Sequence, residues 1–168
     1  MTTMDDMDDP VRVLGARLAA TGQVLLGRSL AVRHVDAGSC GGCEIEIGAC
    51  RRLRGGMAAQ GIVLVDDIRA ADLLLVTGVA TRTLAEALRK SLAGMAPPRF
   101  VVAAGDCALD GGVFKGAPPV LGGVQAVIPV DLLIAGCPPS PRQILAGLTA
   151  LLEANAREAR ARRTEPHA

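Results

Sequence analysis

Apolar residues in this chain cluster in short unbroken runs rather than alternating with polar ones. Four such runs lie at residues 62–65, 73–76, 100–104 and 132–135, and the segment LAVRHVD at 30–36 precedes them. Unbroken runs of Val, Leu and Ile are typical of parallel strands that are covered on both faces. The sequence therefore predicts five strands of a buried sheet.

The segments between these runs have the apolar periodicity of helices. Thr83 with Glu86, and Ser140 with Gln143, form capping-box patterns ahead of two such segments. Another helix is expected to begin at Glu44. Strands that alternate with helices in this way predict an α/β fold, with a mostly parallel sheet flanked by helices in a single domain.

The pattern divides the chain into three parts. Residues 1–29 form an N-terminal extension with an amphipathic helix opened by Asp9 and Pro10, residues 30–155 form the α/β domain, and residues 156–168 form a polar tail. The amphipathic helix packs either against its own domain or against a membrane subunit or interface. The longest nearly uncharged stretch is rich in proline, so we expect no membrane span.

Composition narrows the possible functions. The chain has 168 residues, half of them hydrophobic, and a formal net charge of +1 with opposite charges interspersed. This pattern lacks the cationic face of a nucleic-acid binder, so we expect no nucleic-acid partner. The acidic N-terminus lacks the apolar segment of a secretory signal, which predicts an intracellular protein. In that compartment, clustered cysteines indicate metal binding or catalysis rather than disulfides.

Four of the five cysteines fall where predicted strands end. The first pair lies in SCGGCEIEIGAC at residues 39–50, just after the first strand, and two others follow the apolar runs FVVAA and LLIA. Carboxyl ends of parallel strands share one edge, where ligands usually bind, so we expect these sulfurs to converge. The four residues are Cys40, Cys43, Cys107 and Cys137. The fifth, Cys50, has no partner by spacing and is expected in the core.

Four thiolates at one edge hold either zinc or an iron–sulfur cluster. Structural zinc sites commonly use two local C-x2-C pairs, whereas here one pair is joined by two isolated cysteines. Cys137 precedes Pro138, as in cluster-binding ferredoxins. Helices predicted after Cys43 and at Ser140 would stabilise an anion between them. The pattern favours a [4Fe–4S] cluster, and a zinc-stabilised scaffold without a redox role is the alternative from another class.

Three motifs resemble the signature blocks of a known family. DAGSCGGCEIEI, VVAAGDCALDGGVF and IPVDLLIAGCPPSPRQIL are similar, in this order, to blocks of the small cluster-bearing subunit of complex I and group 4 membrane-bound [NiFe] hydrogenases. The resemblance runs from about Leu30 to about Leu152 and implies a flavodoxin-like fold. It also implies one [4Fe–4S] cluster, with the ligands Cys40, Cys43, Cys107 and Cys137.

The resemblance implies partners as well. It places the chain next to a catalytic large subunit, of nickel–iron or quinone-site type, with a ferredoxin-like cluster subunit and membrane subunits in the same complex. The chain is then an electron-transfer subunit without bond chemistry of its own, peripheral on the cytoplasmic face of the inner membrane. The spacing Cys-Gly-Gly-Cys is similar to the hydrogenase branch, because quinone-reducing members usually carry adjacent cysteines. The alternative is the corresponding small subunit of a quinone-linked complex I, an NADH:quinone oxidoreductase.

Two carboxylates lie beside the first cysteine pair. A carboxylate near an anionic cluster can exchange protons, which makes Glu46 and, more weakly, Glu44 candidates for proton transfer. Glu46 is the better candidate, because the resemblance matches it to the characteristic acidic residue of the family. Alternatively, both are solvated carboxylates favoured by the helix N-terminus. His34, inside a predicted strand, is expected to be a packed or hydrogen-bonded residue rather than a ligand.

Overall fold

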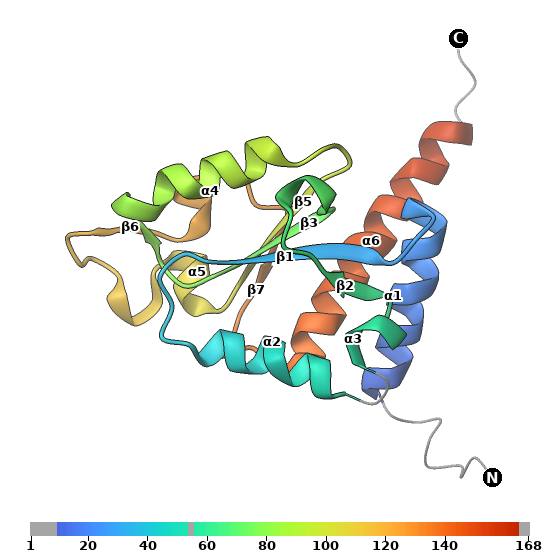
Figure 1. Ribbon diagram of the computed structural model, residues 1–168, viewed down its shortest axis with the longest axis horizontal. Coiled ribbons are helices and arrows are strands. Elements are labelled where there is room, and N and C mark those ends of the chain that lie inside the picture. Colours follow the sequence, from blue (N-terminus) through green and yellow to red (C-terminus); the bar gives the residue numbers. More distant parts are fainter. Residues whose placement is uncertain (1–9, 54–55, 165–168) are drawn as a thin grey trace.

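A five-stranded parallel sheet forms the centre of the molecule (Figure 1). The computed structural model describes residues 10–53 and 56–164. The strand order β2-β1-β3-β5-β7 is that of flavodoxin-like sheets, which confirms the predicted fold class. Its strands are β1 (Leu30–Asp36), β2 (Ile62–Leu64), β3 (Leu73–Thr77), β5 (Phe100–Ala104) and β7 (Leu132–Ile134).

Helices cover both faces of this sheet (Figure 1). The longer ones are α1 (Pro10–Leu26), α2 (Gly42–Arg52), α4 (Arg82–Gly94) and α6 (Pro141–Thr164), with shorter α3 (Gly56–Ala59) and α5 (Asp106–Asp110). Single 3-10 turns lie at η2 (Ile68–Ala70), η3 (Gly112–Phe114) and η4 (Val124–Ala126). A small antiparallel pair joins β4 (Ala80–Thr81) to β6 (Val120–Gly122).

Two apolar cores, one on each face, explain the unbroken runs. Leu73 and Leu75 of β3 pack in the core that α1 and α6 help to form, whereas Leu74 and Val76 pack in the opposite core. Successive residues of a strand point to opposite faces, so a strand buried on both faces must be apolar at every position. The predicted strands match the observed ones to within one residue at each end.

Helix capping follows the predicted pattern in one case and departs from it in the other. Ser140 and Gln143 form a reciprocal box, because the Ser140 amide donates to Gln143 Oε1 at 2.9 Å and the Gln143 amide donates to Ser140 Oγ at 3.4 Å. Thr83 was the wrong cap for α4, since it lies inside the helix. Thr81 takes that place with extended backbone, and its hydroxyl accepts from the Leu84 amide.

The predicted polar tail is helical where it is described. Helix α6 continues to Thr164, so most of residues 156–168 prolong a helix. Alanine, arginine and glutamate fill this stretch, and all three are good helix formers.

Helix α1 packs against its own domain. The Arg17 guanidinium donates to both oxygens of Glu153 on α6, at 2.9 and 2.8 Å, and the Thr149 hydroxyl donates to the carbonyl of Leu14 at 3.3 Å. The predicted cap Asp9 lies outside the described residues. Among the helices of the described ranges, none has the length and apolar character that crossing a membrane requires.

Candidate functional site

Four strand ends lie level along one edge of the sheet. Asp36 pairs with Thr77, Thr77 with Ala104, and Ala104 with Ile134, so these residues form one row across β1, β3, β5 and β7. The turns that carry the predicted cysteines begin just beyond three of these residues. The register of the sheet therefore sets where the cysteine-bearing turns start.

The four predicted cysteines are close enough to affect one another electrostatically. Burial, then the charge of Glu44, then those of Cys107, Cys40 and Cys137, raise the pKa of the Cys43 thiol to about 11. Burial also raises the pKa of Cys107, and the charges of Cys137 and Cys40 add to the effect. Thiols with raised pKa values keep their protons until a cation displaces them, so metal binding here would release protons.

Two glycines beside these sulfurs lie where a side chain would not fit. A Cβ at Gly105 would lie 2.6 Å from Cys43 Sγ, and one at Gly112 would lie 3.1 Å from Cys107 Sγ. Gly105 also has a φ of +97°, which favours glycine. Glycines at these two positions keep the backbone clear beside Cys43 and Cys107, which suits a group bound at those sulfurs. Over residues 10–53 and 56–164, no three His, Cys, Asp or Glu side chains converge closely enough to hold a single metal ion.

Asp106 ties two of the cysteine turns together. Its amide donates to the carbonyl of Gly136 at 2.9 Å, and its Oδ1 accepts from the amide of Gly136 at 2.8 Å. Gly136 directly precedes Cys137, and Asp106 directly precedes Cys107. The two turns are therefore held together by a reciprocal pair of hydrogen bonds.

Hydrogen bonds that sequence reasoning missed shape the first cysteine turn. Asp36 Oδ1 accepts from the amides of Gly38 at 2.8 Å and Ser39 at 2.7 Å. An aspartate two residues before a glycine is a turn signal that could have found this contact. The Glu44 carboxylate accepts from the hydroxyls of Ser39, at 2.8 Å, and of Thr77. No local pattern predicts the contact with Thr77, because it lies on another strand.

The other residues singled out in the sequence, Cys50, Glu46 and His34, have different surroundings. Cys50 is fully buried in the core, as expected, and burial together with the charge of Glu46 raises its pKa to about 11. The carboxylate that acts on Cys43 is instead Glu44. His34 is hydrogen-bonded, as expected, with Nε2 2.9 Å from the hydroxyl oxygen of Thr77. Burial lowers the pKa of His34, while the charge of Glu44 opposes that shift.

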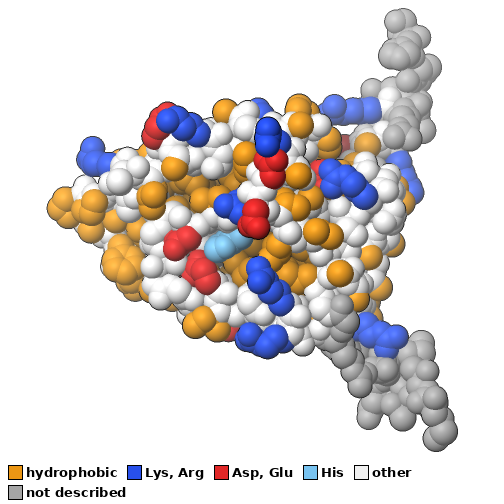
Figure 2. Space-filling model, in the orientation of Figure 1, with side chains coloured by type: hydrophobic (Ala, Val, Ile, Leu, Met, Phe, Trp, Pro, Cys, Tyr) orange, Lys and Arg blue, Asp and Glu red, His pale blue; other side chains and the backbone are white. Residues whose placement is uncertain are grey.

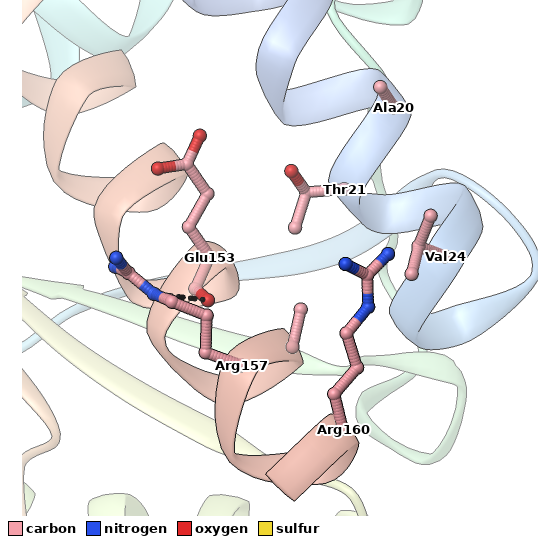
Figure 3. Close-up of a pocket in the computed structure, with 7 residues that line it drawn as sticks. Ala20, Thr21, Val24, Glu153, Arg157 and Arg160 are labelled. Carbon is pink, nitrogen blue, oxygen red and sulfur yellow. Dashed lines mark hydrogen bonds between the residues drawn. The ribbon is translucent and has the colours of Figure 1, made fainter.

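A separate hollow of about 280 Å³ lies between α1 and α6 (Figure 3). Two arginines of α6 extend along it, and the Arg157 side chain donates to the carbonyl of Glu153 at 3.2 Å. None of the predicted site residues lines this hollow. Its lining consists of Ala20, Thr21, Val24, Glu153, Ala156, Arg157 and Arg160.

Comparison with known proteins identifies relatives over most of the chain. The sequence profile of the family described as NADH ubiquinone oxidoreductase, 20 kDa subunit, matches residues 40–151, which include the four cysteines. A probable membrane-bound hydrogenase subunit from Pyrococcus furiosus is 41% identical over 128 residues, covering 76% of this chain and 77% of that protein. A subunit of NADH-quinone oxidoreductase from Phocaeicola vulgatus is 40% identical over 116 residues, covering 68% and 58% respectively.

A solved structure shares the fold. A chain of the membrane-bound sulfane sulfur reductase, an archaeal respiratory membrane complex, matches 89% of this chain and 77% of its own length. The TM-score is 0.66 and the sequence identity is 29%. The arrangement of sheet and helices is therefore similar to that of a chain in a respiratory complex.

The hydrogen bonds of Asp106 lead to a first prediction. Asp106→Ala leaves the Gly136 amide without its acceptor and should lower the free energy of unfolding by about 1–2 kcal/mol. Asp106→Asn keeps an acceptor oxygen at the same position and is the matched control. Urea denaturation of the full chain measures both variants. Equal unfolding free energies for the two would show that the hydrogen bonds between Asp106 and Gly136 do not stabilise the fold.

Proposed function

This chain belongs to the NADH ubiquinone oxidoreductase 20 kDa subunit family, and we propose that it is the electron-transfer subunit of a group 4 [NiFe]-hydrogenase-type complex. Relatives in this family are named as subunits of membrane-bound hydrogenase and of NADH-quinone oxidoreductase. The chain is thus related to subunits of oxidoreductase complexes. The observation that supports the finer proposal is the approach of four cysteines at one sheet edge.

We assign one [4Fe–4S] cluster to these cysteines. When bound, such a cluster supplies one-electron transfer at a potential that its protein surroundings tune. The chain's own contribution is positional: Gly105 keeps the backbone clear beside Cys43, and Asp106 holds two of the turns together. The ligands in this proposal are Cys40, Cys43, Cys107 and Cys137.

Exposed apolar side chains near this edge support a partner subunit. Ile45, two residues after Cys43, is 65% exposed, and Val113, on the turn after α5, is 83% exposed. Figure 2 shows hydrophobic side chains gathered at the narrow end of the molecule, where Figure 1 places the segment between α5 and β6. Exposed apolar groups of this kind mark protein contacts. We propose a catalytic large subunit as the partner here.

The rest of the complex follows from the same proposal. A ferredoxin-like cluster subunit would exchange electrons with this chain, and membrane subunits would hold the assembly at the cytoplasmic face of the inner membrane. The chain itself would be peripheral and would perform no bond chemistry.

The spacing of the first cysteine pair favours the hydrogenase branch over a quinone-linked subunit. Gly41 has a φ of +87°, which favours glycine, and Gly42 opens α2. Gly41 thus lets the chain turn tightly between Cys40 and Cys43. The sequence identities of 41% and 40% to the two kinds of relative do not separate them.

Metal content tests the assigned cluster. The purified chain should contain about four iron and four acid-labile sulfide, whereas a zinc scaffold would contain about one zinc and no sulfide. Cys107→Ser should lose the iron because it removes a ligand. Cys50→Ser is the matched control and should keep it, since Cys50 lies in the core. Iron retained in Cys107→Ser, or zinc in the wild-type chain, would overturn the assignment.

Nickel analysis and hydrogen uptake on the purified complex test the branch. A hydrogenase partner predicts nickel in the complex and hydrogen-dependent reduction of an electron acceptor. Nickel-free material that reduces quinone would instead establish the complex I alternative.

Proton transfer by Glu46 remains a proposal that turnover measurements can test. Glu46→Gln removes the exchangeable proton while keeping the side-chain shape, so turnover of the complex should fall on the order of a hundredfold. The cluster spectrum should stay intact. Glu86→Gln, on the exposed face of α4, is the control. Unchanged turnover in Glu46→Gln would return Glu46 to a structural role, and Glu44→Gln would then be the next variant to measure.

A further inference from the structure

A line of hydrogen bonds runs from His34 through the sheet edge to the first cysteine turn. His34 lies on β1 with a side chain 25% exposed, and its Nε2 is 2.9 Å from the hydroxyl oxygen of Thr77 on β3. Thr77 is fully buried, and its hydroxyl contacts Glu44 Oε1 on α2. The other oxygen of Glu44 accepts from Ser39 Oγ at 2.8 Å. Three elements and one loop therefore meet at a single carboxylate.

Proton counting fixes the direction of these bonds. The Thr77 hydroxyl has a single proton, which it donates to Glu44 Oε1. The bond between His34 and Thr77 must then use the Nε2–H of His34 as its donor. Ser39 likewise donates its only proton to Glu44, which leaves its oxygen to accept from the Gly41 amide at 3.1 Å. Every bond in the series points towards Glu44.

The two ends of this network bracket the first cysteine pair. Ser39 directly precedes Cys40, and Glu44 directly follows Cys43, so their hydrogen bond closes the turn that carries both sulfurs. Ser39 Oγ also holds the Gly41 amide inside that turn. If Glu44 had no other contact, the turn and its Ser39–Glu44 hydrogen bond could move together relative to the sheet. Thr77 attaches the turn to the central strand β3, and His34 Nε2 on β1 also lies 3.5 Å from Glu44 Oε1.

We propose that His34 and Thr77 are positioning residues for the cysteine turn. By donating in series to Glu44, they hold the bridge between residues 39 and 44, and so set the placement of Cys40 and Cys43. Because hydrogen bonds around the ligands tune a cluster, the reduction potential measured at this site depends on both residues although neither is a ligand. The expected effect on the reduction potential rests on the function proposed above. The ordering of the cysteine turn by these hydrogen bonds does not depend on that function.

Two threonines provide a matched test. Thr77→Val removes the buried hydroxyl at nearly constant shape, and Thr77→Ser keeps it. Thr149→Val removes an equally buried hydroxyl, which donates to the carbonyl of Leu145 on α6 away from the cysteine turn. His34→Gln keeps a side-chain N–H near the position of Nε2, and His34→Leu does not.

The first measurement is amide hydrogen exchange of Gly41 in the full chain before iron is added. Thr77→Val and His34→Leu should speed this exchange about tenfold, the factor for one hydrogen bond of about 1.4 kcal/mol. Thr77→Ser, His34→Gln and Thr149→Val should leave it within about twofold of the wild-type rate. Exchange unchanged in Thr77→Val, or accelerated equally in Thr149→Val, would overturn the proposal.

The second measurement is the midpoint potential of the iron-loaded chain, followed by electron paramagnetic resonance. Thr77→Val should shift the potential and the spectrum, Thr77→Ser should restore both, and Thr149→Val should change neither. An identical potential in Thr77→Val and wild type would overturn the proposal. A wild-type chain that takes up no iron would refute the proposed function, and the exchange rates of Gly41 would then decide the positioning role by themselves.

Discussion

The site depends on the level ends of four parallel strands. The row formed by Asp36, Thr77, Ala104 and Ile134 exists because β1, β3, β5 and β7 pair in one register. A shift of one residue in any strand would exchange its two faces, and both faces are buried in separate cores. The aliphatic packing of the two cores therefore fixes where the cysteine-bearing turns begin.

Polar contacts join two of the cysteine turns to each other and attach the first one to the sheet. Asp106 links the turns of Cys107 and Cys137, and Glu44 links the first cysteine turn to β3. Part-buried hydrogen bonds of this kind favour a single arrangement, because a polar group that loses its partner away from water is destabilising. Burial, and then the charges of Glu44 and of the other sulfurs, raise the pKa of the Cys43 thiol at the same place.

Sequence reasoning predicted the strands and the cysteine edge because both depend on local patterns. A run such as LLLV at 73–76 marks a doubly buried strand, and a cysteine after such a run is placed by the parallel topology alone. The cap predicted for α4 was wrong because Thr81 and Thr83 are the same residue type, and only the extended backbone of Thr81 in the structure distinguishes it as the cap. The role of Thr77 was invisible, since its partner is 33 residues away in the chain.

Relatives with different named activities are compatible with one such scaffold. A fold carries no chemistry by itself, and function resides in the site and in what adjoins it. Here the contacts of Glu44 and Asp106 order the cysteine turns, and Ile45 and Val113 are exposed. With the function proposed above, one scaffold of this kind could serve a hydrogen-oxidising or a quinone-reducing partner equally well. The differences between branches should therefore concentrate in the turn between Cys40 and Cys43 and in the surface around it, and not in the sheet.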